Sequence, residues 1–413
     1  MQRGSTQDME QETPIRILHV FGKLNRGGAE SRVMDLYRHM DRTKVQFDFL
    51  VHFRDTCEDP DTLAARRPKE DLDDEVLSLG GRIYVLPRFT GANVGQYKRA
   101  CRRFFAAHHD FTAVEGHMTS TASIYLPIAK DAGVPVVMAH ARSAGVDAGL
   151  RGIATRWLRR SLSRKCDRML SCSQEASVSV YGRRACEEGK IMLVPNALEL
   201  APFFFDEEKR RRIRTSYGIP DNAVVIGHVG RLDAVKNHSY LAGVGKELAG
   251  CEVRFLFAGK GTLQAQIQKA FDEAELGEKV IWTGQLSREE TAAVYQAFDV
   301  FAFPSLYEGM PGTVIEAQAA GLPCVIADTI TEEAVLTNLV IRLPIGEGDK
   351  PLWAKEIKRR TASTNEEEGL VLAGDAIGRR VASARAGVLL DAAGYNVETA
   401  AVKMQKFYME LAG

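Results

Sequence analysis

The chain has 413 residues, of which 45% are hydrophobic and 26% are charged. This composition is typical of a globular protein. The chain is longer than one hydrophobic core usually supports, so two domains are expected. The formal net charge is zero, which argues against a nucleic-acid partner held by a whole-molecule field. No uncharged apolar run approaches the roughly 18 residues of a spanning helix, and the polar residues 1–13 are predicted to be disordered.

The cysteines and the local charge bear on location and partners. Seven cysteines, scattered from Cys57 to Cys324 without a CxxC pair, disfavour a disulfide framework or a zinc site and favour the reducing cytoplasm. Residues 80–170 hold 15 Lys and Arg against 5 Asp and Glu. This excess suits an anionic lipid or a phosphorylated substrate, or it is the solvated surface of helices. Any membrane association is expected to be peripheral.

The first half of the chain alternates apolar segments with helical patterns. A strand predicted at 15–20 leads through a glycine loop into a helix with apolar residues at Val33, Leu36 and Met40. The charged stretch 54–75 has neither helical nor strand periodicity and is predicted to be a mobile loop. Further strands are predicted at 83–86, 113–114, 134–138, 168–172 and 191–194. This alternation indicates a parallel sheet.

The second half repeats the alternation. After a charged segment at 206–214, strands are predicted at 224–228, 253–257, 280–282, 300–303 and 323–326. The last segment, 397–411, is an amphipathic helix that is expected to pack back on the first domain. The predicted fold class is therefore α/β, with one Rossmann-like domain over residues 14–199 plus 396–413 and a second over residues 200–395.

Two glycines and three side chains follow predicted strands of the first domain. Gly27 and Gly28 lie between the first strand and its helix, where the backbone could approach a phosphate or form a plain turn. His117 and His140 follow two later strands at the edge where α/β proteins bind ligands, and Arg142 lies close behind. A lone histidine is usually structural. Two histidines at successive strand ends favour contact with a substrate, either the hydroxyl groups of a group donor or the acceptor molecule.

A cationic segment at 151–168 carries Trp157, Leu158 and Leu162 at helical spacing. An apolar stripe bordered by arginines is typical of a helix that lies at a membrane surface. It is equally typical of a basic surface helix packed on a core. The sequence leaves both interpretations open.

Two cations follow the first strand of the second domain. Arg231 comes directly after Gly230, and Lys236 with Asn237 follows at the expected start of a helix. Fixed positive charge above a strand end can stabilise a diphosphate leaving group, so we predict that the two cations converge on one point. The alternative is a pair of solvated surface cations.

Gly259 and Gly261 flank a lysine after the next predicted strand. They resemble a turn over which a nucleotide base could lie. The GxxxxGK[ST] spacing of a Walker A loop is missing, so this turn is not expected to cradle phosphates in the manner of that loop.

The most informative stretch lies between a predicted strand and a predicted helix. Glu308 falls in the loop and Glu316 in the first turns of the helix, so both are expected to face one cleft. Carboxylates accept hydrogen bonds from the vicinal hydroxyls of ribose and hexose, while the helix N-terminus offers amides to phosphate. Taken separately, the first is typical of an exposed loop and the second of a helix-dipole partner. Between them lie Gly309, Met310, Pro311, Gly312 and Thr313.

Three motifs in this order resemble glycosyltransferase family 4, and its exopolysaccharide, capsule and lipopolysaccharide branch is the most similar. They are GGAE at 27–30, GRLxxxKN at 230–237 and EGMPGTVIEAQAAGLPCV at 308–325. The resemblance covers about residues 15–411 and implies the GT-B fold, in which two Rossmann-like domains face each other across a cleft. It implies an acceptor-binding first domain, a donor-binding second domain and a retaining reaction that needs no metal or cofactor.

By this resemblance, Glu308 would hold the donor sugar, Glu316 the ribose, and Arg231 with Lys236 the diphosphate. His117 would lie near the donor sugar. The backbone of the loop before the helix would line the donor, together with the glycines named above, and Gly27 with Gly28 would lie against phosphates or acceptor. The remaining first-domain candidates for the acceptor are His140 and Arg142.

We therefore expect a cytoplasmic glycosyltransferase that uses a nucleotide-sugar donor and a saccharide or lipid-linked acceptor. The choice of UDP for the donor follows family frequency. The basic helix is a candidate for peripheral membrane contact. Two alternatives stay open: a sugar phosphorylase or epimerase on the same fold, and a non-catalytic subunit that binds a sugar nucleotide. No motif suggests the Schiff-base lysine of a pyridoxal-type phosphorylase.

Overall fold

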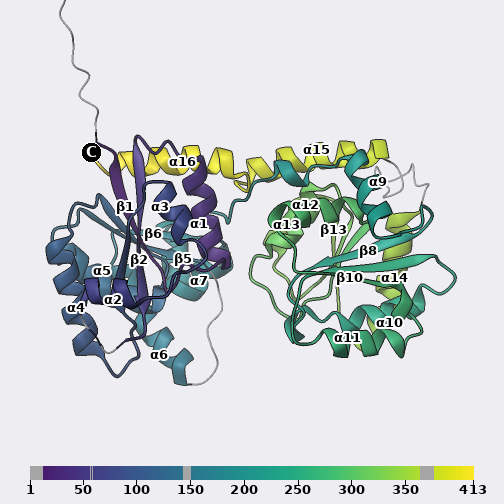
Figure 1. The fold of residues 1–413 in the computed structure, drawn as a ribbon, viewed down its shortest axis with the longest axis horizontal. Coiled ribbons are helices and arrows are strands. Elements are labelled where there is room, and N and C mark those ends of the chain that lie inside the picture. Colours follow the sequence, from purple (N-terminus) through teal and green to yellow (C-terminus); the bar gives the residue numbers. More distant parts are fainter. Residues whose placement is uncertain (1–12, 56, 58, 143–149, 363–375) are drawn as a thin grey trace, which may run out of the picture. The chain divides into compact units, whose positions relative to one another are not determined.

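The computed structural model describes residues 13–55, 57, 59–142, 150–362 and 376–413. The predicted disordered segment 1–13 lies outside these residues except for Thr13. The chain forms two compact units, one of Met1–Ala197 with Val397–Gly413 and one of Leu198–Asn396. Each is an α/β domain built on a parallel sheet, as the sequence predicted (Figure 1).

The first unit holds a seven-stranded parallel sheet with the order β3-β2-β1-β4-β5-β6-β7. The strand order reverses beside β1, which pairs with β2 on one side and β4 on the other. In open α/β sheets, ligands bind outside the carboxyl ends of the strands at such a reversal. The strands are β1 (Ile15–Val20), β2 (Val45–Phe53), β3 (Ile83–Pro87), β4 (Ala113–Gly116), β5 (Val136–Ala141), β6 (Arg168–Ser171) and β7 (Ile191–Leu193).

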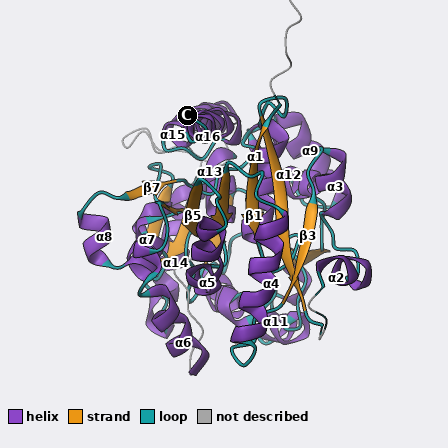
Figure 2. Cartoon of the chain, turned by 90° about the vertical axis from the view of Figure 1, so that its left-hand side faces the viewer, coloured by secondary structure: helices purple, strands orange, loops and turns teal. Residues whose placement is uncertain are grey.

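Helices cover both faces of this sheet (Figure 2). Side chains of successive strand residues point to opposite faces, and the two core layers divide accordingly: Ala113 packs in one layer and Val114 in the other. One layer includes α1, α3 and α16, and the other includes α4, α5 and α7. The helices are α1 (Gly28–His39), α2 (Pro60–Arg66), α3 (Asp73–Ser78), α4 (Val94–Ala107), α5 (Thr119–Asp131), α6 (Leu150–Arg159), α7 (Gln174–Tyr181), α8 (Arg183–Glu187) and α16 (Val397–Glu410).

The second strand was not predicted, although its sequence carries a clear pattern. In the run VQFDFLVHF, residues 45–53, all side chains except Gln46 and Phe53 are buried. Asp48 is completely buried but forms an ion pair with Arg16, and Nδ1 of His52 donates to the carbonyl of Phe21. An ion pair and a hydrogen bond therefore allow these polar residues to be buried within the apolar run.

The prediction of an irregular loop over 54–75 is wrong, because two short helices form there. Asp59 caps α2 by accepting a hydrogen bond from the backbone of Thr62 at 2.9 Å, and proline follows it at the first helical position. The nearly buried Arg67 pairs with Glu70 at 2.6 Å and with Asp73 at 2.8 Å. The charge of Arg67 is therefore neutralised locally, whereas Lys69 and Asp74 pair on the surface.

The basic helix is shorter than the predicted 151–168 span. α6 ends at Arg159, and Leu162 is buried in the 3-10 turn that follows. Trp157 is 70% exposed, and so does not share an apolar stripe with Leu162 as predicted. Its neighbour on the helix surface is Ile153, four residues earlier and 57% exposed.

The second unit holds a six-stranded parallel sheet with the order β10-β9-β8-β11-β12-β13, so its strand order reverses between β8 and β11. The strands are β8 (Val224–Val229), β9 (Val253–Ala258), β10 (Val280–Gly284), β11 (Val300–Phe303), β12 (Cys324–Ala327) and β13 (Val340–Leu343), the last of which was not predicted. Helices α10 and α14 pack together, as do α9 with α12 and α13 with α15. The helices are α9 (Glu207–Ser216), α10 (Ser239–Glu247), α11 (Gln264–Asp272), α12 (Arg288–Ala297), α13 (Gly312–Ala319), α14 (Lys350–Thr361) and α15 (Ala376–Ala392).

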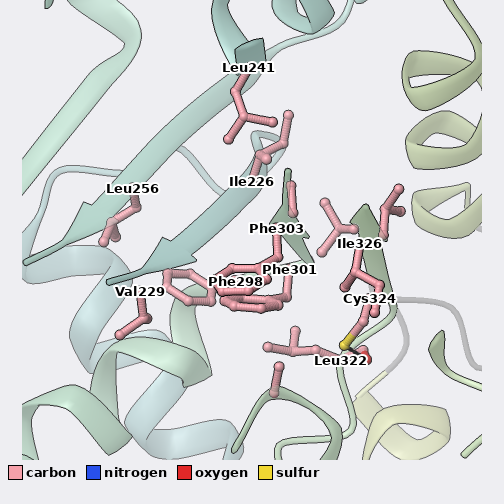
Figure 3. Packing of buried hydrophobic residues seen from close by; sticks show 14 of the residues in the cluster. Ile226, Val229, Leu241, Leu256, Phe298, Phe301, Phe303, Leu322, Cys324 and Ile326 are labelled. Carbon is pink, nitrogen blue, oxygen red and sulfur yellow. Dashed lines mark hydrogen bonds between the residues drawn. The ribbon is translucent and has the colours of Figure 1, made fainter. Parts of the chain in front are cut away.

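The core of this unit centres on aromatic residues of β11. Phe301 and Phe303 lie 5.5 Å apart between ring centroids, and Phe298 lies beside them (Figure 3). Gly227 on β8 leaves room for that ring, since a Cβ there would come within 2.2 Å of Phe298. This close packing fixes the end of β11, from which the predicted donor loop departs.

No helix among the described residues combines the length and the apolar character needed to cross a membrane.

Candidate active site

Two loops meet at the carboxyl ends of β8 and β9 in the second unit. Gly259 has φ +143°, and a Cβ on it would lie 2.0 Å from the carbonyl oxygen of Gly230. A Cβ on Gly261 would lie 2.2 Å from the carbonyl oxygen of Leu232, whose amide donates to Lys260 at 3.1 Å. Both glycines are therefore required for the close approach of the two loops, whether or not a ligand binds beside them.

Lys236 is held at the reversal of strand order. The side chain of Asp233 accepts from its backbone amide, and Asn237 follows in the left-handed region with φ 53°. The Nζ of Lys236 lies 2.5 Å from Oε1 of Glu308 and 4.6 Å from the ring centroid of Phe303. The lysine and glutamate side chains are only 17% and 19% exposed, so this ion pair is shielded from bulk water.

The two predicted cations do not share a single anion in this structure. Arg231 is 79% exposed and pairs with Asp233 at 3.4 Å, whereas Lys236 pairs with Glu308. Each cation takes a carboxylate within reach of its own position in the loop. Their convergence on one diphosphate therefore stays a prediction, and both cations follow the same strand.

The helix after β11 begins as predicted and presents free amides. α13 starts at Gly312 after Pro311, and no described side chain caps it. A Cβ on Gly309 or Gly312 would meet no described atom within 4 Å, so there is open space beside both. An uncapped helix N-terminus in such space favours an anion.

The two predicted carboxylates are held by different partners. Glu308 in the loop contacts Lys236, while Glu316 on α13 accepts a hydrogen bond from the hydroxyl of Tyr295 at 2.9 Å. Burial raises the pKa of Tyr295 well above its usual value, and the nearby Glu316 adds to this effect. The tyrosine therefore remains a hydrogen-bond donor that fixes the orientation of Glu316.

Several buried polar atoms around these loops have no hydrogen-bond partner among the described residues. They are Oγ of Ser305, Oγ1 of Thr313, Nε2 of His228 and both ring nitrogens of His238. His228 donates from Nδ1 to the carbonyl of Ala302 at 2.9 Å, which leaves a lone pair on Nε2. Unsatisfied buried polar atoms are destabilising, and their clustering at one sheet edge is consistent with a polar ligand.

In the first unit, the predicted residues His117, His140 and Arg142 gather around a carboxylate that sequence reasoning missed. Glu115 is fully buried and accepts from Nδ1 of His140 at 2.7 Å, and from the hydroxyl of Tyr408 at 2.6 Å. Burial acts to raise the pKa of Glu115. The hydrogen bond from His140 and the charges of nearby imidazoles outweigh burial and hold that pKa well below the usual carboxyl range.

The contacts of Arg142 determine where the histidine protons lie. Its Nε donates to Nδ1 of His117 at 3.2 Å, and a guanidinium cannot accept, so His117 carries its proton on Nε2. That proton points to Nδ1 of His19 at 3.0 Å, so His19 in turn is protonated on Nε2. Burial lowers the pKa of His19 and His140 to about 4, and it holds that of His117 well below its usual value. All three rings are therefore neutral at pH 7.

This cluster limits what the predicted histidines can touch. The side chain of His140 is completely buried and that of His117 is 2% exposed, with Phe21 stacked on it at 4.2 Å between ring centroids. Both nitrogens of His117 are engaged inside the unit. Direct contact of either histidine with a substrate therefore requires rearrangement, and the guanidinium of Arg142 lies closer to the surface.

The same cluster contains ligand types that a metal could use. Atoms of His19, Glu115 and His117 lie within 4.8 Å of one another. However, His19 and His117 are hydrogen-bonded to each other, and the Arg142 guanidinium lies 4.0 Å from Glu115. This adjacent positive charge opposes the binding of a further cation.

The Gly27–Gly28 loop also differs from a simple anion cradle. α1 begins at Gly28, but the carboxylate of Glu30 folds back to where a Cβ on Gly27 would lie, 2.3 Å away. Burial raises the pKa of Glu30. The carboxylate of Glu30 therefore lies beside Gly27, at the start of the helix.

Comparison with known proteins gives the family. A model described as "Glycosyl transferase 4-like domain" matches residues 27–197, and one described as "Glycosyl transferases group 1" matches residues 209–369. The putative glycosyltransferase EpsF of Bacillus subtilis is 34% identical over 354 residues, which are 84% of this chain and 88% of that protein. This chain belongs to the family 4 glycosyltransferases. It is a transferase enzyme with the GT-B type of fold.

Two further comparisons place this family 4 glycosyltransferase among known members. The crystal structure of HepE from Anabaena in complex with UDP has a TM-score of 0.71 and 15% identity, over 96% of this chain and 100% of that chain. The UDP-Gal:alpha-D-GlcNAc-diphosphoundecaprenol alpha-1,3-galactosyltransferase of Escherichia coli is 26% identical over 237 residues, 55% of this chain and 60% of that protein.

Signals for some of the missed residues are present in the sequence of this transferase. Glu115 is a lone acidic residue in an apolar strand, and His228 and His238 flank the GRLxxxKN motif. A charged residue inside a buried strand indicates a paired, functional or structural contact. No comparable signal marks Tyr408, whose partner Glu115 lies 293 positions away.

Proposed function

We propose that this glycosyltransferase transfers a sugar from a UDP-sugar to a saccharide or lipid-linked acceptor in cell-surface polysaccharide synthesis, with retention of configuration and without a metal ion. The observation that carries the proposal is the shielded Lys236–Glu308 ion pair beside the uncapped start of α13. The UDP in the HepE structure supports the donor, and the activity for which the E. coli relative is named supports both the donor and the acceptor class.

In this proposal, Lys236 exchanges one anion for another. Negative charge develops on the diphosphate as the bond between the anomeric carbon and the phosphate oxygen breaks, and a fixed cation stabilises that charge. Glu308, released from the lysine, then accepts hydrogen bonds from sugar hydroxyls. Arg231 exchanges Asp233 for the same diphosphate, which its exposed side chain can reach by rotation.

The start of α13 and its carboxylate bind the rest of the nucleotide. The free amides at Gly312 and Thr313 donate to phosphate oxygens. Glu316, oriented by Tyr295, accepts from the ribose hydroxyls. In a retaining reaction of this kind, the acceptor oxygen attacks on the face that the phosphate leaves, and a phosphate oxygen takes its proton, so no protein base is needed.

The reaction can be tested before the acceptor is known, because such enzymes can be assayed for slow donor hydrolysis. The protein is incubated with UDP-glucose, UDP-galactose and UDP-N-acetylglucosamine, and in parallel with GDP-linked and ADP-linked sugars, each in EDTA and with added Mg²⁺. Proton NMR follows the released sugar. The proposal predicts that an α-linked donor first releases the α-anomer. Release of the β-anomer would refute retention, turnover of only GDP-linked or ADP-linked donors would refute UDP, and a requirement for added metal would refute metal independence.

We also propose that α6 contacts an anionic membrane surface. Its exposed Ile153 and Trp157 border a hollow of about 600 Å³ and are flanked by Arg156 and Arg160. The printed sequence has no acidic residue from 148 to 166. Apolar residues rimmed by cations suit a lipid headgroup layer.

Vesicle sedimentation tests this contact. The wild-type protein should sediment with vesicles containing phosphatidylglycerol and not with pure phosphatidylcholine. Trp157→Ala should weaken that binding, whereas Trp282→Phe, in the second unit, should not. Equal sedimentation of the wild type and Trp157→Ala would refute the role of α6.

A further inference from the structure

The C-terminal helix α16 reaches the buried cluster of the first unit through Tyr408. The hydroxyl of Tyr408 donates to Oε2 of Glu115 at 2.6 Å, while Oε1 of the same carboxylate accepts from His140 at 2.7 Å. The Arg142 guanidinium lies 4.0 Å from Oε1. One carboxylate therefore joins the C-terminal helix to the ends of β4 and β5.

The tyrosine hydroxyl is not needed for packing. The ring of Tyr408 packs edge-on against Phe47 at 5.6 Å and His19 at 6.3 Å between centroids, contacts that phenylalanine would also make. The residue is only 1% exposed, so its hydroxyl does not reach bulk water. The hydrogen bond to Glu115 is thus what distinguishes tyrosine from phenylalanine here.

Through Glu115, this bond controls the histidines. The carboxylate orients His140 directly and balances the charge of Arg142, which in turn sets the tautomers of His117 and His19. Without the phenol, Glu115 loses one of its two donors and becomes a stronger acceptor for protons from the imidazoles.

We propose that Tyr408 is a positioning residue that acts through Glu115 to fix the ring orientation and proton positions of His117 and His140. This inference rests on the proposed function and on the expectation from the sequence that Arg142 contacts the acceptor. It assigns to the C-terminal helix a chemical role besides its packing on α1.

Histidine NMR on the full-length protein tests the proposal without needing a substrate. In protein labelled with ¹⁵N-histidine, His19 and His117 should appear as Nε2–H tautomers and His140 as the Nδ1–H tautomer. Tyr408→Phe should shift these signals and raise the titration midpoint of His140 by about one pH unit. Glu115→Gln, a second variant, should disturb the same signals if the first fails to fold.

Tyr37→Phe is the matched control. Tyr37 is also fully buried in the same core layer, but its hydroxyl bonds to Gln46 and to the carbonyl of Leu79. Both variants should lower the melting temperature similarly, but only Tyr408→Phe should change the histidine signals. Identical histidine spectra in Tyr408→Phe and wild type would overturn the proposal.

Turnover provides the second readout. Tyr408→Phe should lower kcat for donor consumption roughly tenfold while the donor KM stays unchanged, whereas Tyr37→Phe should leave both unchanged. If the wild type turns over no nucleotide sugar, the proposed function fails and the histidine spectra alone decide whether Tyr408 positions the cluster. Equal kcat in the two variants of an active enzyme would refute the effect on catalysis.

Discussion

At the scale of single residues, Lys236 and Glu308 distinguish the donor loop from an ordinary loop. The pair is shielded, lies over Phe303 and sits beside an uncapped helix. We predict that Lys236→Met or Glu308→Gln lowers kcat by roughly 10² to 10³, because each removes one contact to developing charge or to the sugar. Donor turnover measures this loss. A variant with wild-type kcat would show that the residue lies outside the chemistry.

The sequence singled out these residues because motif spacing places Lys236 after β8 and Glu308 after β11. It could not predict that Arg231 and Lys236 take different carboxylates, since that depends on side-chain rotamers. It also missed Glu115 and Tyr408, whose contact spans 293 positions and exists only after α16 packs on the first unit. Residue spacing predicts which side chains share a loop or a helix. Contacts between residues far apart in the sequence follow from tertiary packing.

At the scale of elements, the loops after β8 and β9 depend on glycine. We predict that Gly259→Ala lowers the free energy of unfolding by about 2–4 kcal/mol, because the new Cβ meets the carbonyl of Gly230 in a backbone region that disfavours side chains. Gly250→Ala, also at positive φ but with no described atom within 4 Å, should lose only about 1 kcal/mol. Urea unfolding compares them, and equal losses would contradict the steric explanation.

Helix α15 is anchored by one buried cation. The guanidinium of Arg379 donates to the carbonyls of Tyr295, Gln296, Phe298 and Ala320, at the ends of α12 and α13. Burial lowers the pKa of Arg379 well below its usual value, although the carbonyls still favour the charged form.

The loss of that anchor removes one donor from each of these buried carbonyls, although those of Gln296 and Phe298 also accept from Arg210. We predict that Arg379→Met destabilises the second unit by about 3–5 kcal/mol. The exposed neighbour Arg380 provides the control, and Arg380→Met should change stability by less than about 0.5 kcal/mol. Thermal unfolding measures the stability of both variants. A small effect of Arg379→Met would mean that water or a side chain replaces the guanidinium.

At the scale of the whole molecule, the sequence predicted two α/β domains and most strands correctly. It missed β13, and it missed β2, whose polar residues are buried with partners. It also missed the helices α2 and α3, between which Arg67 pairs with Glu70 and Asp73. Periodicity detects faces that alternate between core and solvent. It fails where ion pairs let charged residues be buried.

Buried neutral histidines make the stability of the protein pH-dependent. Burial lowers the pKa of His19, His52 and His140 in the first unit to about 4, whereas histidine in an unfolded chain titrates near 6.5. Between these values the unfolded state binds more protons, so stability falls as the pH falls. Each of these residues should remove about 1–2 kcal/mol between pH 7 and pH 5.

Urea titrations at pH 7, 6 and 5 test this dependence. The midpoint should fall progressively below pH 6.5, and the first unit should be affected more than the second. An unchanged midpoint down to pH 5 would show that these histidines are protonated or accessible in the folded protein.

In the proposed reaction, the second unit binds a uridine diphosphate through Lys236. Calorimetric titration of UDP in EDTA, into wild type, Lys236→Met and the exposed control Lys269→Met, tests it most directly. We expect UDP to bind wild type and Lys269→Met with similar affinity, and to bind Lys236→Met at least tenfold more weakly. Equal affinity for all three proteins, or binding of GDP or ADP in preference to UDP, would contradict it.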